Sequence, residues 1–572
     1  MELQGRFTNP VSKNIHITKY RTNGESFRDS TARVADSTTD SPWHFEAYKG
    51  ILRAFRFLPG GRVQSAMGAP RTVTPYNCFV CKTVEDSMES IMSAATYAAD
   101  TMRLGGGIGY DFSRIRPRGD LITTLDSQAS GPVSYMRIFD AVCQTISSSG
   151  HRRGAQMAVL RVDHPDIEEF IHCKQNSTYL TAFNISVGIT DAFMRSLAEN
   201  EEFPLTFGGK VYKRVSARKL WDDIMRSTWD WAEPGVLFID RINRENNLHY
   251  CETIEATNPC GEQPLPPNGA CLLGSFNLTQ YLSWDSESAT YSFDWRLFRQ
   301  DIPIVIRAMD NVIDRAVYPK PEQREEALAK RRMGIGVTGL ANALEAMGHP
   351  YGSRGFLLQM DDILRVLCHE SYFASVNLAK DKGAFPLFKA DQYLQSKFIQ
   401  EKLPEYIKER IRRYGIRNSH LMSIAPTGTI SLAANNVSSG VEPVFSVRQE
   451  RTIQTFDGPE VHLLEDYGKA VLGVNPKTAN EVTAHEHVEV LCTAQKWMDS
   501  AVSKTCNVGD DVSWEDFKNL YILAYNGGAK GCTTFRASGK RMGILKAKDT
   551  EDSEVALACA YDPETGTRSC DG

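Results

Sequence analysis

The chain lacks the features of a membrane or secreted protein. It has no uninterrupted apolar stretch long enough to span a bilayer, and its first residues, "MELQGRFTNPVSKN", lack the apolar core of a secretory signal. It also has no long block of Lys and Arg, and its formal net charge is −5. These absences disfavour membrane insertion and direct nucleic-acid binding, and they predict a cytoplasmic protein.

Cysteine is too sparse for a disulfide scaffold. The 572 residues contain 13 cysteines, an odd number that excludes complete intramolecular pairing. Most of the thiols are therefore expected to be reduced and buried. Cys78 and Cys81 have C-x-x-C spacing, but no second Cys or His pair nearby completes a zinc site. We predict no metal site here, and a metal-binding redox protein remains an alternative that a zinc assay would test.

The order of apolar patterns predicts an α/β architecture. Strand-like runs such as "YNCFV", "AQMAVLRV" and "AFNISVGI" alternate with helical runs such as "SMESIMSAATYAADTMRL" and "GPVSYMRIFDAVCQTI". Before them, "WHFEAYKGILRAFRF" predicts a helix that stops at the breaker "LPGGR". We expect an N-terminal helical segment over 1–70, an α/β domain over 71–540 and a mobile polar tail over 541–572.

Two glycine-rich stretches lack the pattern of common nucleotide-binding motifs. "RLGGGIGYDFSR" follows a helical run and has Tyr110 where G-x-G-x-x-G needs its third glycine, so a dinucleotide fold is disfavoured. A close backbone approach to a ligand remains possible there. "MSIAPTGTISLAANN" has no Walker lysine, but it joins an apolar run to a helix expected to begin near Ile430 and Ser431. Such a helix N-terminus can bind an anion, although an ordinary Ser/Thr helix cap explains the same letters.

The stretch "EATNPCGEQPL" places Asn258, Cys260 and Glu262 at alternate positions. Pro259 disfavours a helical conformation for Asn258, and in an extended segment the three side chains point to the same face. Gly261 allows the backbone to bend tightly. An amide, a thiol and a carboxylate can then converge on one small molecule, while a loop that satisfies its own backbone is the alternative interpretation.

Cys260 has no histidine beside it in the sequence, and the nearest one is His249. Because a nucleophilic cysteine usually needs such a base, one-electron chemistry is a second use for this thiol. A thiyl radical at Cys260 would take a hydrogen atom from carbon, while the carboxylate of Glu262 removes a hydroxyl proton from the same substrate. The amide of Asn258 would hold the neighbouring oxygen.

"NPCGEQPL" followed by "GACLLGSFNL" resembles the finger-loop region of ribonucleotide reductase large subunits, and the resemblance extends through nearly the whole chain. It includes "YNCFVCKTVEDSMESI", "RLGGGIGYDFSRIRPRG", "RRGAQMAVLRVDHPDIEEFI", "PGVLFIDRIN", "RRMGIGVTGLANAL", "APTGTISLAANNVSSGVEP", "AVSKTCNV" and "GAKGCTTFR". The resemblance implies a ten-stranded α/β barrel built from two half-barrels, with the finger loop threaded through its centre.

The resemblance also implies roles for single residues. Cys260 would be the thiyl radical that takes the 3′ hydrogen, Glu262 the base at the 3′ hydroxyl and Asn258 a hydrogen-bonding partner of the substrate. Cys78 and Cys271 would supply two electrons and form a disulfide in each turnover. Cys81 is the rival to Cys78, but the position just before the strand run favours Cys78, and the alternation of a strand places residues 78 and 81 on opposite faces.

Further residues follow from the same resemblance. Those expected to bind the ribonucleotide substrate are Asn77, Gly106, Gly107, Thr427, Gly428, Thr429 and Ser431. Those expected to bind a deoxynucleotide or ATP effector that sets base preference are Asp86, Ser87, Arg152 and Arg153. A thioredoxin- or glutaredoxin-like reductant would act through tail cysteines Cys559 and Cys570, although these are not the close pair common in the family. The effector match favours a homodimer.

Two missing motifs point to the radical source. The chain has no adjacent Tyr-Tyr pair, which relays the radical in the branch with a separate metal subunit, and no R-V-x-G-Y motif of the glycyl-radical branch. The chain therefore resembles the adenosylcobalamin-dependent class, which "PTGTIS" and "KGCTTFR" also favour. It has no D-x-H-x-x-G motif, so we name no cobalt ligand, and the N-terminus has no recognisable ATP-cone domain.

Two other functions remain open at this point. The chain could be a catalytic subunit that needs a separate radical-generating metal subunit, in which case cobalamin alone would give no product. It could also be a nucleotide-binding protein that has lost catalysis, although the complete set of predicted catalytic residues argues against this. The sequence does not decide between diphosphate and triphosphate substrates.

Overall fold

The computed structural model describes most of the chain. The described residues are 7–22, 24–122, 126–148, 152–153, 155–175, 179–455, 458–536, 539, 561–562 and 567–568. Within them, no helix is both long enough and apolar enough to cross a membrane.

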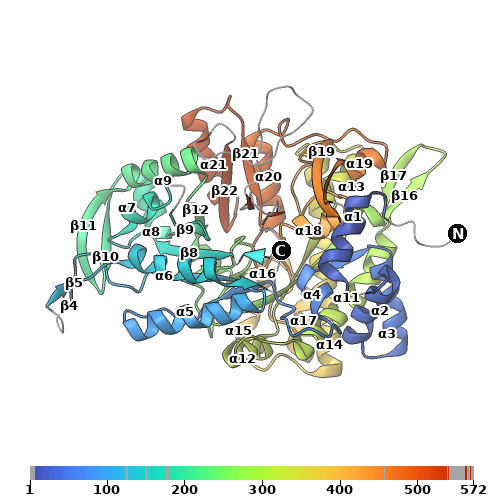
Figure 1. The fold of residues 1–572 in the computed structure, drawn as a ribbon, viewed down its shortest axis with the longest axis horizontal. Helices are drawn as coiled ribbons and strands as arrows, with labels where there is room; N and C mark the ends of the chain where they lie inside the picture. The colour runs from blue at the N-terminus through green and yellow to red at the C-terminus, as the bar shows by residue number, and fades with distance from the viewer. Residues whose placement is uncertain are drawn as a thin grey trace.

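The first half of the central sheet consists of parallel strands joined by helices. Its neighbours pair in the order β2, β3, β8, β9 and β12, and each of these pairs is parallel. The strands are β2 (Cys78–Val80), β3 (Gly107–Asp111), β8 (Gln156–Arg161), β9 (Phe183–Ile189) and β12 (Gly235–Phe238). Their sequences are nearly continuous apolar runs because both faces of a parallel sheet are covered. The helices α5 (Met88–Arg103), α6 (Pro132–Thr145) and α9 (Ala217–Trp231) lie beside this half (Figure 1).

The second half is also parallel, and it runs antiparallel to the first. It contains β15 (Ala270–Asn277), β18 (Met333–Thr338), β21 (Thr505–Val508) and β22 (Gly531–Arg536). β15 pairs with β18 in parallel, and β21 pairs with β22 in parallel. The two halves meet antiparallel at two seams, where β2 pairs with β15 and β12 pairs with β22.

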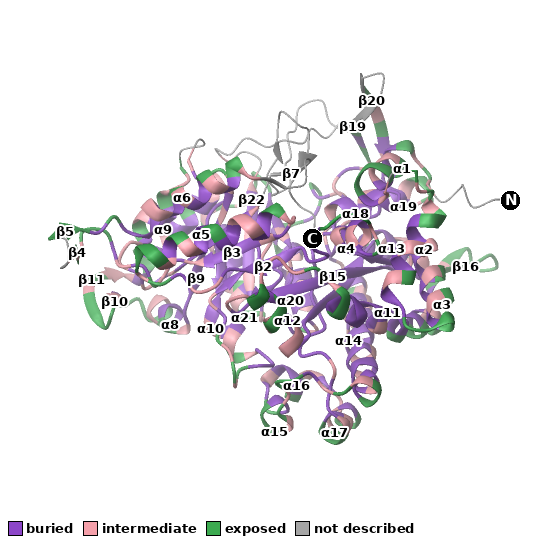
Figure 2. Ribbon diagram, turned by 60° about the horizontal axis from the view of Figure 1, so that its bottom comes forward, coloured by how far each residue is buried: buried purple, intermediate pink, exposed green. Residues whose placement is uncertain are grey.

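Isolated β-bridges connect β18 to the segment that leads into β21 and so join the strands of the second half. Ile335 of β18 forms a parallel bridge with Met422, and Ile424 forms one with Val502, which leads into β21. The predicted α/β barrel of two half-barrels is therefore confirmed, with a 10-stranded sheet as its frame. Figure 2 shows that the strands at its centre, including β2, β3 and β15, are buried.

The side chains of the sheet separate into an inner and an outer core. Facing outward, Phe79 and Tyr110 pack with helix residues such as Ala94 and Phe139 in the largest apolar cluster. A smaller inward cluster contains apolar residues from both halves together with two of the predicted redox thiols. Its members include Cys78, Val80, Met157, Val159, Leu237, Cys271, Leu273 and Ala425. The predicted chemistry therefore lies on the inner face of the barrel.

The N-terminal segment is packed onto the second half of the barrel. It contains the predicted helix, α3 (Pro42–Arg53), preceded by α1 (Pro10–Ile15) and α2 (Phe27–Thr38) and followed by α4 (Gly61–Ala66). The segment "LPGGR" does more than end a helix, because β1 (Phe57–Pro59) pairs antiparallel with β15. The domain boundary at residue 70 stays a prediction, since the segment before it contributes a strand to the sheet.

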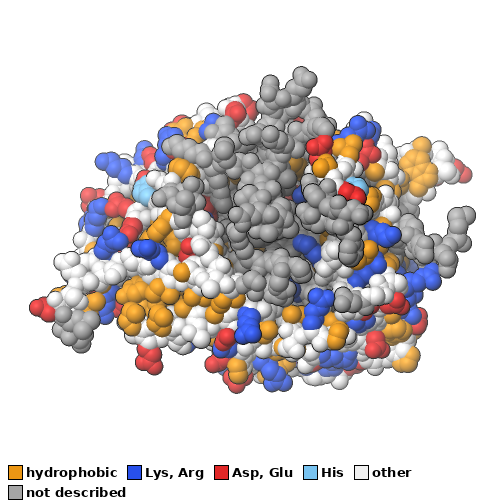
Figure 3. Space-filling model, viewed as in Figure 1, with side chains coloured by type: hydrophobic (Ala, Val, Ile, Leu, Met, Phe, Trp, Pro, Cys, Tyr) orange, Lys and Arg blue, Asp and Glu red, His pale blue; other side chains and the backbone are white. Residues whose placement is uncertain are grey.

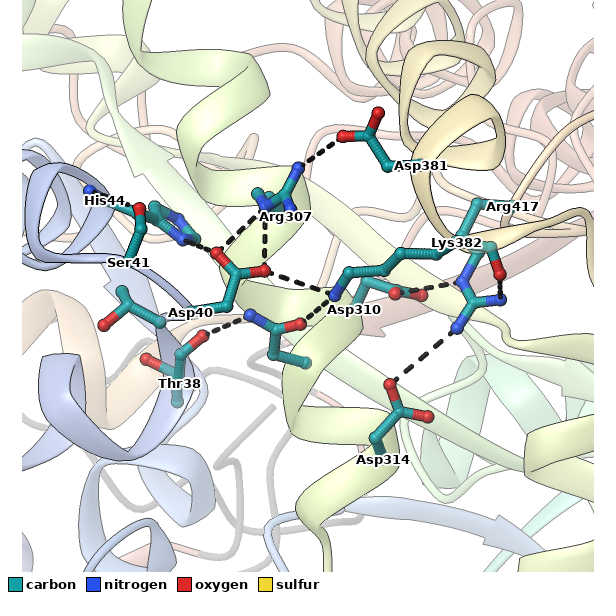
Figure 4. A network of polar contacts seen from close by, with 12 residues as sticks. Thr38, Asp40, Ser41, His44, Arg307, Asp310, Asp314, Asp381, Lys382 and Arg417 are labelled. Atoms are coloured by element: carbon teal, nitrogen blue, oxygen red, sulfur yellow. Dashed lines mark hydrogen bonds and ion pairs between the residues drawn. The ribbon is translucent and has the colours of Figure 1, made fainter.

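A network of charged side chains joins this segment to two long helices (Figure 4). Arg307 on α11 (Trp295–Arg315) donates to Asp40 at 2.8 Å and to Asp381 at 2.8 Å. Lys382, the last residue of α14 (Arg354–Lys382), lies 3.4 Å from Asp40. His44 of α3 contacts the same carboxylate at 3.1 Å. Asp40 thus joins the start of α3 to both helices.

The finger loop is a short hairpin inside the barrel. Its strands are β13 (Ala256–Thr257) and β14 (Pro264–Leu265), which pair antiparallel and leave 258–263 as the tip. Glycines on the barrel wall make room for it. A Cβ at Gly109 would lie 1.8 Å from the carbonyl oxygen of Thr257, and one at Gly107 would lie 3.1 Å from Pro259. The expected close approach at "GGGIG" is therefore an approach of the protein's own loop.

Replacing Gly109 with alanine is expected to displace the finger loop. The new methyl group would overlap a backbone oxygen, so we expect a loss of stability of about 1–3 kcal/mol and, because a shift of about 1 Å at a reacting group is enough, a loss of turnover of about 100-fold. Thermal unfolding and product assays measure the two effects. Gly188→Ala on β9 is the matched control, because a Cβ there meets its nearest atom at an ordinary 3.6 Å. Equal losses of stability and turnover in the two variants would contradict this account.

Candidate active site

The finger-loop tip is a turn, and this corrects the expectation of an extended segment. The amide N–H of Gly261 donates to the carbonyl oxygen of Asn258 at 3.1 Å, and Gly261 has a φ of +82°. The amide of Gln263 donates to the side-chain oxygen of Asn258 at 2.9 Å. Asn258 and Glu262 therefore converge because the chain reverses between them, and the alternation of a strand is not the cause.

Asn258, Glu262 and Cys78 form one hydrogen-bonded group. The side-chain N–H₂ of Asn258 donates to Glu262 Oε1 at 2.8 Å and to Cys78 Sγ at 3.1 Å. The thiol of Cys78 lies 3.5 Å from the same carboxylate oxygen, to which it donates. All three side chains are buried, so an amide, a carboxylate and a thiol from distant parts of the chain share one small space.

Glu262 has the properties of a proton acceptor near neutral pH. Its complete burial raises the pKa of its carboxyl group to about 7, against smaller lowering effects from hydrogen bonds with Asn258 and Cys78. Its second oxygen, Oε2, is buried and has no hydrogen-bond partner among the described residues. Burying a carboxylate oxygen without a hydrogen-bond partner costs free energy. This cost is consistent with an oxygen that accepts a hydrogen bond from a substrate hydroxyl.

Cys78 and Cys271 are directly opposite each other at the seam between the half-barrels. They are register partners in the antiparallel pair of β2 and β15. Cα atoms of opposed residues in such a pair are about 4.5–5.5 Å apart, which lies within the range of a disulfide. Both are buried thiols in the inner cluster and neither is in a disulfide here. The seam thus carries a dithiol that can be oxidised without a large change of backbone.

Cys81 lies on the other side of the sheet. It belongs to the outer cluster, its thiol contacts the carbonyl oxygen of Ala94 on α5 at 3.8 Å, and burial raises its pKa to about 12. The structure therefore brings Cys78, and not Cys81, to the finger loop. The redox role of Cys78 stays a prediction.

Cys260 is at the tip of the turn and is half-buried. Its charge is among the influences that raise the pKa of Cys78, after burial and the charge of Glu262, so the two sulfur atoms are in the same site. Beside it, a Cβ at Gly261 would meet no atom within 4 Å. The tip of the turn thus has open space beside Gly261, and its Cys260 is in the same site as the buried polar group.

Residues that were not predicted hold the finger loop in place. Asn184 on β9 donates to the carbonyl oxygen of Pro259 at 2.9 Å. The carbonyl oxygen of Glu262 accepts from the hydroxyl of Ser423 at 3.0 Å and from the amide of Ala501 at 3.0 Å. Both half-barrels therefore bind the loop backbone. Nothing near Asn184 or Ser423 in the sequence signals these long-range contacts.

The "PTGTIS" segment lies beside the end of β18 and leads into a short helix. Helix α18 (Gly428–Ala433) is short, and Thr427 before it has a φ of +54°. The hydroxyl of Thr427 accepts from the amide of Gly440 at 2.7 Å and contacts the Thr338 hydroxyl at 2.9 Å. The Ser431 hydroxyl donates to Gly428 at 3.1 Å. The Thr427 and Ser431 hydroxyls thus shape the segment, and its phosphate-binding role stays a prediction.

The other predicted substrate residues lie where the seam meets the loop. Asn77 directly precedes β2, and its carbonyl oxygen accepts from the amide of Gly107 at 2.8 Å. A Cβ at Gly106 would lie 2.5 Å from the ring of Phe79. Packing therefore requires glycine at 106, and at Gly107 a Cβ would make a tight contact of 3.1 Å with Pro259 of the finger loop.

Two of the predicted effector residues, Asp86 and Ser87, lie at the start of α5. Asp86 accepts from the Arg116 side chain at 2.6 Å, and Ser87 caps α5 through a bond from the amide of Ser90 at 3.2 Å. Arg152 and Arg153 are in the short strand β7 (Arg152–Arg153), but their side chains are outside what the structure describes. The tail cysteines, Cys559 and Cys570, also lie outside the described residues.

The fold and site together define an α/β-barrel enzyme with a thiol on a central finger loop and a dithiol at the seam of the barrel. Residues 76–471 and 474–535 match the family described as ribonucleotide reductase, barrel domain. The chain belongs to the ribonucleotide reductase family.

Individual relatives match along most of the chain. A protein of Mycobacterium tuberculosis strain CDC 1551, named vitamin B12-dependent ribonucleoside-diphosphate reductase, is 34% identical over 90% of this chain and 76% of its own length. A protein of the same name from Thermoplasma acidophilum is 35% identical over 96% of this chain and 74% of its own length. A vitamin B12-dependent ribonucleotide reductase of Streptomyces coelicolor is 28% identical over 94% of this chain and 64% of its own length.

Proposed function

We propose that this chain reduces ribonucleotides to 2′-deoxyribonucleotides by thiyl-radical chemistry. The observation that carries the proposal is the convergence of Asn258 and Glu262 with Cys78, which is opposite Cys271 at the seam. Cys260 lies at the tip of the same loop. Family membership and the names of the relatives support this function, and two of those names specify diphosphate substrates, which we therefore propose here.

Each residue has a defined role in the proposed reaction. The Cys260 sulfur radical takes the 3′ hydrogen atom of the ribose, and Glu262 takes the proton of the 3′ hydroxyl while Asn258 holds the carboxylate in place. The 2′ hydroxyl then leaves as water with the proton of one of the two thiols of Cys78 and Cys271, and the hydrogen of the other thiol goes to the 2′ carbon. Two electrons come from Cys78 and Cys271, whose S–H bonds are replaced by one S–S bond. Cys260 returns the hydrogen atom to the 3′ carbon and recovers its radical.

The cofactor that we propose is adenosylcobalamin. When bound, it supplies a carbon-centred radical that can take the hydrogen atom of a thiol. The site fits such a group because Cys260 is only half-buried and Gly261 beside it borders open space. Among the described residues, no group of three or more His, Cys, Asp or Glu side chains could hold a metal ion by itself.

We also propose the partners that the family resemblance implies. A deoxynucleotide or ATP would bind near Asp86, and a thioredoxin- or glutaredoxin-like protein would restore the dithiol through the tail. A homodimer is supported by apolar side chains that are unusually exposed around α5, namely Met88 (55%), Met92 (46%) and Leu121 (54%). Figure 3 shows hydrophobic side chains gathered on this part of the surface, with both signs of charge dispersed elsewhere on the same face.

A product assay tests the function. Purified protein is mixed with a dithiol and with CDP or CTP, with and without adenosylcobalamin and deoxynucleotide effectors, and deoxycytidine nucleotide is measured. We expect product only when cobalamin is present, and more from CDP. No product with either nucleotide and any effector would favour a missing radical subunit or a catalytically silent nucleotide binder.

A further inference from the structure

Arg332 faces the inside of the barrel next to Cys271. The parallel register of β15 and β18 pairs Leu272 with Met333 and Leu273 with Gly334. One step back along both strands, Arg332 comes opposite Cys271. Side chains alternate between the two faces of a strand, so Arg332 shares the inner face with Gly334. A Cβ at Gly334 would lie 2.3 Å from the Gln263 side chain of the finger loop, which confirms that this face is the inner one.

The charge of Arg332 belongs to a balanced, buried cluster. Its side chain is 1% exposed, and its guanidinium lies 2.7 Å from Glu326 and also pairs with Glu252. Lys330 lies 2.9 Å from both of these carboxylates. Two cations therefore face two carboxylates, and the pairing leaves no net negative charge around Arg332. Of all charged groups, Arg332 has the largest influence on Cys271, where it favours the thiolate and partly offsets the pKa increase that burial causes.

Cys78 has the opposite surroundings. Its nearest charged group is Glu262, at 3.5 Å, and a negative charge there disfavours a second negative charge on sulfur. The side chain of Asn258 also donates to Cys78, but it is a neutral donor that it shares with Glu262. Hydrogen bonds of neutral donors are weaker than interactions with full charges. The largest charged influence is therefore an anion at Cys78 and a cation at Cys271, where the charges of Asp499 and Glu262 oppose Arg332 with smaller effects.

We propose that Arg332 is a positioning residue that directs thiol exchange, so that an external thiol attacks Cys78 and Cys271 leaves as the thiolate. This inference rests on the proposed function of the two cysteines as a redox pair. A thiolate of an external dithiol forms a bond to Cys78 Sγ, and the bond between Cys78 and Cys271 breaks. The electron pair stays on Cys271 beside Arg332. The second external thiol then displaces Cys78, which takes up a proton, and the external dithiol is oxidised by two electrons.

The direction of exchange has a physical reason. A disulfide breaks faster when the leaving sulfur is better stabilised as an anion, and the attacked sulfur is then the other one. Both residues are buried, so access does not distinguish the two sulfur atoms. The charges around them favour attack on Cys78.

Trapping the mixed disulfide tests this inference without turnover. The full chain is oxidised with diamide, its remaining thiols are blocked, and 2-mercaptoethanol is added before an acid quench. Peptide mass spectrometry then locates the adduct. We expect about tenfold more adduct on Cys78 than on Cys271, and Arg332→Gln should bring the two amounts close to equal.

Arg331→Gln is the matched control. Arg331 is the neighbouring residue and is similarly buried, and it also pairs with two carboxylates, Asp310 at 2.9 Å and Asp314 at 2.7 Å. These partners are on α11, as Figure 4 shows, and the buried apolar residues of this helix belong to the outer cluster. Its loss should lower stability comparably and leave the adduct on Cys78.

Each outcome separates the inference from the function on which it rests. If diamide forms no disulfide between Cys78 and Cys271, the redox pair and this inference both fail. If the disulfide forms but the parent chain carries the adduct on Cys271, or the ratio is the same in Arg332→Gln, only the inference is overturned. If Arg332→Gln does not fold, the position of the adduct in the parent chain is the test. An adduct on Cys78 supports the inference, and an adduct on Cys271 overturns it.

Discussion

A Cys260→Ala variant is expected to bind a ribonucleotide as the parent chain does and to form no deoxyribonucleotide. In the proposed reaction this sulfur is the only atom that takes hydrogen from the substrate, and no neighbouring thiol can replace it because Cys78 is committed to the reductive step. The side chain is only half-buried at a turn, so its loss should cost little stability. Equilibrium nucleotide binding and a product assay measure the two properties separately.

The control for this variant is Cys251→Ala. Cys251 is an exposed cysteine a few residues before the same loop, and nothing in the site involves it. It should retain the parent rate. Product formation by Cys260→Ala at a rate comparable with that of Cys251→Ala would disprove the radical role of Cys260.

Glu262→Gln is expected to lower turnover by about 10²- to 10⁴-fold, the usual contribution of a general base. It should also change the pH dependence. Because burial raises the pKa of Glu262 to about 7, the parent rate should rise with pH up to this value as the carboxylate forms. The rate of Glu262→Gln should not show this rise with pH. Glu255→Gln, which changes a half-buried glutamate of the same segment that pairs with Arg114 at 2.9 Å, should keep it.

The same pKa predicts a change in stability. The folded chain holds a proton on Glu262 over a pH range in which the unfolded chain, with a pKa near 4.5, has lost it. The corresponding stability is fully present below pH 4.5 and is lost as the pH rises through 7, by about 3 kcal/mol. Urea unfolding of the parent and of Glu262→Gln at several pH values measures this. Identical slopes in the two proteins would contradict a buried, titrating Glu262.

Part of the site could be predicted because its residues are close in sequence. Asn258, Cys260 and Glu262 lie within a few positions, so any compact conformation of the loop brings them together. The particular reason given for their convergence was wrong, since a turn closed by Gly261 replaces the extended segment. Short-range spacing thus identified the group of residues but not its geometry.

The rest depended on contacts between distant segments. The pair of Cys78 and Cys271 was expected only from the family resemblance, because their opposition comes from the register of two strands at a seam, which no local pattern determines. Gly109 is required because the Thr257 backbone passes close by, and a glycine-rich sequence does not say what approaches it. The position of Arg332 beside Cys271 could not be predicted from a local pattern either, because it comes from the pairing of β15 with β18.

In the proposed reaction, the position of the dithiol would change the topology of the chain in each catalytic cycle. A bond between Cys78 and Cys271 would convert a linear polymer into a lasso whose loop contains the first half-barrel. Closing a loop of this size restricts the unfolded chain and is worth about 5 kcal/mol in the chain-entropy account. The oxidised protein should therefore resist heat and proteases better than the reduced one. Its lifetime in a cell would then depend on how quickly the reductant returns it to the open form.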